Sequence, residues 1–297
     1  MGLYREIRRA VRLTIRHLPL IGHRSTSSQQ QPKSKRPRIY EWMLFYPVKY
    51  PVGRWNPPGL VKQDVWIESK DGTKLHAWYC PCENPRAVIL ITHGNAGNIA
   101  YRTEWLTILQ QQFRVTTLMI DYRGYGRSEG VPTIEGVIED SQAARTRVAE
   151  LAGVNEADVV LMGESLGGAI AIQLARMITP RALIVQSSFR SLQNVAWQNY
   201  GPLAWVIPAS KLNSWRAIGE IHCPILISHG AQDRLIRWKS IRKLVAKAHA
   251  QAQFILLDEV GHNDWITARY LAALEEFFSA LERTGAKPAP SSYADAL

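Results

Sequence analysis

The sequence predicts an α/β fold, with a mostly parallel sheet of about eight strands and helices on both faces. Short β-rich runs alternate with helical patterns from residue 87 to residue 283. Before them, two β-rich runs are joined by Asp71-Gly72, a dipeptide typical of hairpin turns. A length of 297 residues is enough for one substantial domain of this kind, or for two small ones.

Each predicted element rests on the spacing of its apolar residues. The strand candidates are Val61–Ser69, Lys74–Pro81, Ala87–Thr92, Val115–Ile120, Val159–Met162, Ala182–Gln186, Pro224–Ser228 and Gln253–Leu257. Helical spacing predicts helices near 99–112, 135–153, 166–178, 238–250 and 264–283. Strands that alternate with helices in this way pair in parallel, because each helix carries the chain back along the sheet.

The basic charge of the chain is concentrated at its start. Residues 1–38 hold ten Lys or Arg and one acid, a net charge of +9, whereas the whole chain carries +11. Residues 1–18 place apolar side chains on one helical face and arginines opposite, which indicates a basic amphipathic helix for an anionic membrane surface. A disordered basic extension fits the same composition. We expect a linker over 24–38, one domain over 39–284 and a flexible tail over 285–297.

Composition excludes several other classes of protein. With its tail set aside the chain is nearly neutral, so no nucleic-acid-binding face is predicted. We expect a cytoplasmic protein with reduced thiols, because the three cysteines, Cys80, Cys82 and Cys223, form no pairing framework. Peripheral membrane association is expected separately, through the basic tail. Neither a zinc motif nor the Lys-Ser/Thr of a phosphate loop is present, so no metal and no cofactor are predicted. No apolar run of about 18 residues predicts a membrane-spanning helix.

The stretch Gly163-Glu164-Ser165-Leu166-Gly167 lies between a predicted strand and a predicted helix. A serine on such a sharp turn is pushed out of the sheet, and the flanking glycines let neighbouring backbone pass close by. This arrangement exposes a serine hydroxyl as a nucleophile. The same residues also fit an ordinary strand-to-helix turn with a capping serine, so further partners are needed to decide.

A serine nucleophile needs a base, and the base needs an acid that orients it. Asp233 follows the strand Pro224–Ser228, and His262 follows the strand Gln253–Leu257, so both lie in loops beyond strand ends. We therefore predict a Ser165–Asp233–His262 triad. Asp140, Asp258 and Asp264 are rival acids, but Asp233 has the best placement at a strand end.

The oxyanion of an acyl-transfer intermediate needs backbone donors. One predicted donor is the N–H of Leu166, directly after the serine and at a helix N-terminus. The other is Asn95, in the loop that follows the strand Ala87–Thr92. A glycine-rich connector without a catalytic part is the alternative for that loop. His93, at the end of the same strand, is predicted to be structural.

Residues 187–222 interrupt the alternation of strands and helices and are rich in aromatic side chains. Inserted near the predicted site, they indicate a short cap over an apolar pocket, which favours an acyl or otherwise apolar substrate. Packing of the aromatic residues in a core is the alternative.

These motifs together resemble the α/β-hydrolase superfamily, and within it the bud-emergence-type (Bem-like) serine hydrolases and the α/β-hydrolase-domain lipases and depalmitoylases. The resemblance covers about residues 45–281. It rests on Phe45-Tyr46-Pro47, His93-Gly94-Asn95-Ala96-Gly97-Asn98, the run from Asp121 to Gly130, the stretch around Ser165, Ser188-Phe189-Arg190-Ser191-Leu192 and Gly261-His262-Asn263-Asp264. It implies Ser165 as nucleophile, Asp233 as acid, His262 as base, and Asn95 with Leu166 at the oxyanion hole.

The function predicted first is a serine hydrolase that cleaves carboxylic esters or thioesters through an acyl-serine intermediate, with no cofactor. A serine aminopeptidase would use the same triad. A non-catalytic scaffold at a membrane surface is the alternative from another class. A carboxylate would have to stand at position 165 in a haloalkane dehalogenase or an epoxide hydrolase, which disfavours both.

Overall fold

The computed structural model describes residues 36–248 and 252–283. The amphipathic helix predicted over residues 1–18, most of the predicted linker and the tail predicted over 285–297 lie outside this part of the chain. Within it, no helix is both long enough and apolar enough to cross a bilayer.

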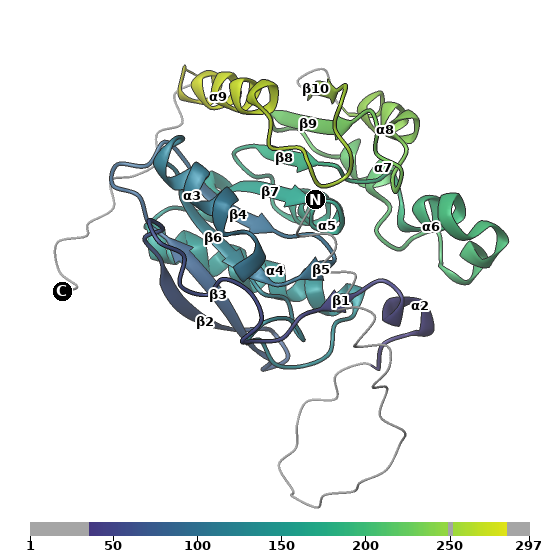
Figure 1. Ribbon diagram of the computed structural model, residues 1–297, viewed down its shortest axis with the longest axis horizontal. Coiled ribbons are helices and arrows are strands. Elements are labelled where there is room, and N and C mark those ends of the chain that lie inside the picture. The colour runs from purple at the N-terminus through teal and green to yellow at the C-terminus, as the bar shows by residue number, and fades with distance from the viewer. Residues whose placement is uncertain (1–35, 249–251, 284–297) are drawn as a thin grey trace, which may run out of the picture.

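The predicted α/β class is confirmed, with one eight-stranded sheet at the centre of the described chain (Figure 1). The strand order is β10-β9-β8-β7-β4-β6-β3-β2, and β3 alone runs in the direction opposite to the other seven strands. The strands are β2 (Gln63–Glu68), β3 (Lys74–Cys80), β4 (Val88–Thr92), β6 (Thr116–Ile120), β7 (Val160–Glu164), β8 (Leu183–Gln186), β9 (Ile225–Gly230) and β10 (Ala252–Leu257). All eight predicted strands are found within a few residues of their expected ends.

The β2–β3 hairpin shows why a local turn signal is reliable. Gly72 adopts a φ of 83°, a left-handed conformation that suits glycine. The Asp71 carboxylate accepts a hydrogen bond from the Thr73 N–H at 3.1 Å. Turn chemistry inside the sequence thus fixes the register, which pairs Glu68 with Lys74.

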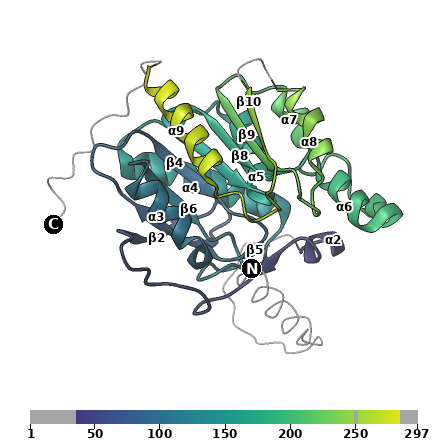
Figure 2. The ribbon, with the colours of Figure 1, turned by 45° about the horizontal axis from the view of Figure 1, so that its top comes forward.

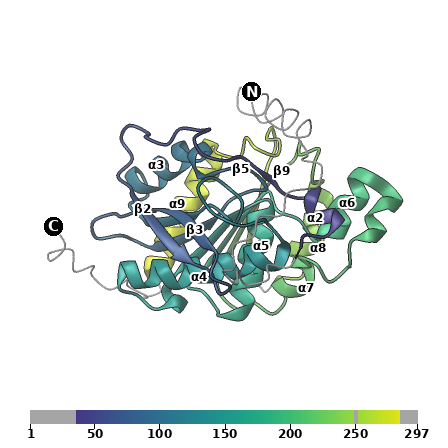
Figure 3. The ribbon, with the colours of Figure 1, turned by 90° about the horizontal axis from the view of Figure 1, so that it is seen from below.

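Helices cover both faces of the sheet and form a three-layered molecule, as Figure 3 shows from below. On one face lie α3 (Thr103–Gln111) and α9 (Ala268–Arg283), whose apolar residues share a core with β4 and β10. On the other lie α4 (Ile134–Ala152) and α5 (Leu166–Met177), which build the second core. Because strands at the centre are buried on both faces, β4 and β6 are apolar or uncharged throughout.

The segment between β8 and β9 leaves the sheet and folds into three short helices. These are α6 (Leu192–Tyr200), the 3-10 helix η3 (Gly201–Val206) and α7 (Ser214–Ile218). Figure 2 shows α6 projecting from the body of the domain, with α8 (Trp238–Val245) close to its base. The segment predicted as a cap therefore consists of helices, which its irregular pattern had not indicated.

Some short elements were not predicted. Strands β1 (Tyr46–Pro47) and β5 (Ala96–Gly97) pair in parallel over two residues each, and α2 (Ile39–Trp42) is a single helical turn. The helix predicted over 99–112 is two helices, because the 3-10 helix η1 (Ile99–Tyr101) precedes α3. Another 3-10 turn, η2 (Glu156–Asp158), leads into β7. Elements this short have no apolar period from which they could be recognised.

Candidate active site

Ser165 stands on a sharp turn between β7 and α5. Its φ of 53° and ψ of −114° are strained for a residue with a side chain, as expected of a serine held out of a sheet. The turn closes because its glycines have no side chains. A Cβ on Gly163 would lie 2.3 Å from the Gly167 oxygen, and one on Gly167 would lie 1.9 Å from the Thr92 oxygen. The Ser165 backbone is also fixed, since its N–H donates to Gln186 O at 2.8 Å.

The structure brings the three residues of the predicted triad together. His262 Nε2 lies 3.0 Å from Ser165 Oγ, and His262 Nδ1 lies 2.7 Å from Asp233 Oδ2. Because the Asp233 carboxylate accepts at Nδ1, the proton of a neutral imidazole stays on that nitrogen and leaves Nε2 free to accept from the serine. The side chain of Ser165 is thereby placed to lose its proton to His262.

The Asp233 carboxylate has hydrogen-bond partners other than His262. Its Oδ1 accepts from the backbone N–H groups of Leu235 and Ile236, both at 2.9 Å. Its Oδ2 also lies 3.2 Å from His229 Nε2. Burial alone would raise the pKa of the Asp233 carboxyl, but the hydrogen bonds with His229 and His262 outweigh burial and hold that pKa well below its usual range. The acid is therefore ionised at neutral pH.

The rival acids are engaged elsewhere. Asp140 is buried and binds the guanidinium of Arg123 at 2.6 Å. Asp258 forms an exposed ion pair with Arg269 at 2.8 Å, and Asp264 is exposed. None of the described hydrogen bonds of His262 goes to any of these three acids, so Asp233 is its acidic partner.

His93 is buried, as a structural histidine would be. Its Nδ1 donates to Gly94 O at 2.7 Å, and its ring lies 4.3 Å from that of Tyr122. Burial and the nearby Arg102 lower the pKa of His93 to about 3, so the ring is neutral at physiological pH. No hydrogen bond among the described residues joins His93 to Ser165.

The two predicted oxyanion donors lie at the start of a helix, for Leu166, and in a loop fixed by several hydrogen bonds, for Asn95. Leu166 is the first residue of α5, where a backbone N–H has no partner inside the helix. Asn95 donates from its side chain to Leu44 O at 3.0 Å, and its carbonyl accepts from Tyr46 N and Tyr125 Oη. These contacts fix the loop firmly, but none of them involves the Asn95 N–H, whose role stays a prediction.

An ion pair joins the serine turn to the Asn95 loop, and the sequence did not reveal it. Arg102 Nε lies 3.3 Å from Glu164 Oε2, and Arg102 Nη2 donates to Ala96 O at 3.3 Å. Gly94 passes close to the same carboxylate. A glutamate at the end of a buried strand, directly before the serine, is the only sequence signal for this pair. His229 was missed as well, although its spacing of four from Asp233 was visible.

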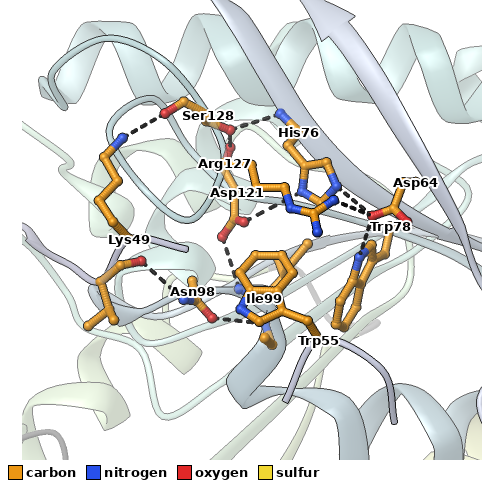
Figure 4. A network of polar contacts seen from close by, with 12 residues as sticks. Lys49, Trp55, Asp64, His76, Trp78, Asn98, Ile99, Asp121, Arg127 and Ser128 are labelled. Carbon is orange, nitrogen blue, oxygen red and sulfur yellow. Dashed lines mark hydrogen bonds and ion pairs between the residues drawn. The ribbon is translucent and has the colours of Figure 1, made fainter. Parts of the chain in front are cut away.

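A network of polar side chains connects to η1, the 3-10 helix that follows the Asn95 loop (Figure 4). His76 stands between two carboxylates, with Nε2 at 2.7 Å from Asp64 and Nδ1 at 3.8 Å from Asp121. Asp121 also accepts from the Ile99 N–H at 2.9 Å, while Ser128 donates to the Asp121 carbonyl at 2.6 Å. Burial raises the pKa of the Asp121 carboxyl. The network ties the turn after β6 to η1, directly after the Asn95 loop.

Two hollows lie in the segment predicted as a cap. The larger, of about 390 Å³, is lined by Arg190, Ser191, Gln193, Asn194, Trp197 and Trp205. The other shares three of those side chains and includes Trp215. Ser165 and His262 line neither of them, and polar side chains accompany the tryptophans. The apolar substrate pocket expected beneath the cap therefore stays a prediction.

The sequence is similar to one family model and to proteins of Arabidopsis thaliana and Salmonella typhimurium. A family model described as serine aminopeptidase, S33, matches residues 83–211. The alpha/beta hydrolase domain-containing protein WAV2 of Arabidopsis thaliana is 34% identical over 232 residues, covering 70% of this chain and 75% of that protein. The uncharacterized protein YfhR of Salmonella typhimurium is 31% identical over 252 residues, covering 79% of this chain and 85% of its own length.

Solved structures resemble the fold at lower sequence identity. The esterase Pf2001 of Pyrococcus furiosus superposes with a TM-score of 0.67 and 18% identity, over 80% of this chain and 98% of that one. At 18% sequence identity, this similarity shows a shared fold and nothing further.

Proposed function

Because the chain belongs to the α/β-hydrolase superfamily, we propose that it is a serine hydrolase that cleaves carboxylic esters or thioesters through an acyl-serine intermediate. The observation that carries the proposal is the continuous hydrogen-bonded chain from Ser165 Oγ through His262 to Asp233. Three separate loops bring these groups together, and such an arrangement activates a serine for attack on a carbonyl carbon.

Acylation begins when Ser165 Oγ attacks the carbonyl carbon and its proton moves to His262 Nε2. The negative charge that develops on the carbonyl oxygen is stabilised by backbone donors, for which Leu166 and Asn95 are proposed. The bond to the leaving group then breaks, and the alcohol or thiol takes the proton from Nε2. Asp233 stays ionised throughout and stabilises the imidazolium.

Deacylation repeats these steps with water as the nucleophile. His262 Nε2 accepts a proton from water, the hydroxide attacks the acyl carbon, and the ester bond to Ser165 breaks. The proton on Nε2 returns to the serine oxygen, and the carboxylic acid leaves. The cycle consumes one water and needs no other reactant.

The direct test is the Ser165→Ala variant. With p-nitrophenyl acyl esters of graded length, the proposal expects the wild type to turn over and the variant to fall to background. Ser188→Ala is the matched control, because that hydroxyl donates to the Ser165 carbonyl at 2.8 Å but lies outside the proton path. Hydrolysis by the Ser165→Ala variant at the wild-type rate would overturn the proposal.

A serine aminopeptidase is the second candidate, favoured by the description of the matching family model. It would use the same triad on an amide bond and would need an acidic or carbonyl-rich subsite for a free α-amino group. Turnover of amino-acid p-nitroanilides at rates above those of acyl esters would select it over the esterase.

A further inference from the structure

The segment that follows β8 exposes large apolar side chains to solvent. Leu203 is 73% exposed and Trp205 is 76% exposed, and Trp197, Tyr200 and Val206 are exposed as well. Residues 191–210 contain no charged side chain. Contiguous exposed apolar surface of this kind marks a place where a protein meets a partner or a membrane. We call these five side chains the cap ridge.

The exposed side chains of the cap ridge lie on helices that already pack against the domain through other residues. In the same helices, Leu192 and Ala196 of α6 and Ala204 of η3 are buried against the domain, so each helix has an inner apolar face. The rings of Trp197 and Trp205 lie 6.4 Å apart, which joins α6 to η3 on the outer side. These helices therefore carry large apolar side chains on the outer side as well as apolar side chains on the inner side, and only the inner ones pack against the domain.

A basic helix lies beside the cap ridge. Asn199 donates to Leu235 O at 3.1 Å, and the Arg237 N–H donates to Gln198 at 3.3 Å, so the segment leading into α8 is bound to α6. Residues 234–247 hold six Lys or Arg and no acid. Five of these basic side chains are exposed on and before α8: Arg234, Arg237, Lys239, Arg242 and Lys243. We call them the α8 basic face.

On the other side of α6 lies α2, and all three ribbon views place the two helices next to each other (Figures 1–3). Glu41 holds α2 down, because its carboxylate accepts from the N–H groups of Arg38 and Ile134, both at 2.7 Å. The apolar side chains Ile39 and Trp42 of this helix are left exposed. α2 thus adds two exposed apolar side chains on the helix next to α6.

We propose that the cap ridge and the α8 basic face together form a docking surface for an anionic lipid bilayer. Tryptophan and tyrosine prefer the boundary between headgroups and acyl chains, and Leu203 and Val206 add apolar contact below it. Lysine and arginine next to such a surface are attracted by anionic headgroups. A second copy of this chain fits less well, since a two-fold contact through the ridge would bring two basic α8 faces near each other.

The surface lies at the edge of the sheet where the candidate active site opens. The cap ridge follows the carboxyl end of β8, while Ser165 follows that of β7 and Asp233 follows that of β9. Docking would therefore bring this edge to the bilayer. The proposal does not depend on the proposed hydrolysis, because binding is measured without turnover.

The test is flotation of the full chain on vesicles of phosphatidylcholine alone and of phosphatidylcholine with phosphatidylserine. We expect Leu203→Ser/Trp205→Ser to reduce binding to both kinds of vesicle at least tenfold. Trp66→Ser is the matched control, since Trp66 is an exposed tryptophan on β2, at the far edge of the sheet. Unchanged thermal unfolding shows that each variant is folded. Equal binding of wild type and the double variant to the phosphatidylcholine vesicles, which offer no net negative charge to the basic segment, would overturn the proposal.

The α8 basic face is tested separately. Lys239→Gln/Arg242→Gln/Lys243→Gln should lose at least tenfold in binding to the phosphatidylserine vesicles and little on pure phosphatidylcholine. The control replaces three exposed basic residues remote from α8: Lys70→Gln/Lys74→Gln/Arg114→Gln. An equal loss in this control, or absence of wild-type binding, contradicts the proposal. So does a dimer in sedimentation velocity that the Leu203→Ser/Trp205→Ser variant dissolves while vesicle binding is unchanged.

Discussion

Replacement of Asp233 by asparagine separates the geometry of the proposed triad from its charge. The carboxylate accepts at Oδ2 from His262 Nδ1 at 2.7 Å and is held at Oδ1 by two backbone N–H groups. An asparagine can keep the Oδ1 contacts, which leaves its NH₂ group facing His262. The imidazole must then accept at Nδ1, so its proton moves to Nε2, where it faces Ser165 Oγ. The base is lost although the fold is kept.

The expected loss in kcat is roughly 10³- to 10⁴-fold, or about 4–5 kcal/mol of transition-state stabilisation. Hydrolysis of a p-nitrophenyl ester at neutral pH measures it, with thermal unfolding as the check of the fold. Asp258→Asn and Asp264→Asn are the controls, because both acids are exposed and neither contacts His262. A kcat for Asp233→Asn within tenfold of the wild type would refute the assignment of the acid.

Three further predictions concern the glycine behind the serine turn, the charge of Asp233 and the basic segment at the start of the sequence. Gly167→Ala should destabilise the protein by about 3 kcal/mol or more, seen in urea unfolding, because its Cβ would lie 1.9 Å from the Thr92 oxygen. The pKa of Asp233 is lowered in the folded state, so its contribution to stability is present above about pH 4 and is lost as pH falls below it. Urea unfolding at pH 6 and pH 3 should therefore show a smaller drop for Asp233→Asn than for the wild type; an equal drop would contradict this. Neutralising Arg5, Arg8, Arg9, Arg12 and Arg16 to glutamine in the full chain should weaken binding to anionic vesicles and leave ester hydrolysis unchanged, and equal vesicle binding would reject a role for this segment.

The fold was predictable where a local pattern determines the structure. A central strand such as β4 is an almost continuous run of apolar residues, and the Asp71-Gly72 turn carries its own hydrogen bond, so both are visible in a few residues of sequence. The β1–β5 pair was not predictable, because two residues pair with two others about fifty positions away. The turn of α2 depends on the Glu41 carboxylate reaching Ile134, a contact that local sequence cannot contain.

The same division holds in the candidate site. Ser165, Asp233 and His262 could be chosen because each follows a recognisable strand, and parallel strands bring their carboxyl ends to one edge. The Arg102–Glu164 pair joins the end of β7 to the residue before α3, and its members look like ordinary charged residues until the fold brings them within 3.3 Å. The donor role of Asn95 depends on the direction of one N–H group, which sequence order does not determine.

The central claim is that Ser165 carries the acyl group during turnover. The most direct measurement is the intact mass of the protein after reaction with a slowly deacylating ester or a fluorophosphonate, followed by mapping of the labelled peptide. We expect the mass of one acyl or phosphonyl group, located on Ser165 and absent from the Ser165→Ala variant. A label on another residue, or ester hydrolysis at the full rate with Ser165 unlabelled, would contradict the account.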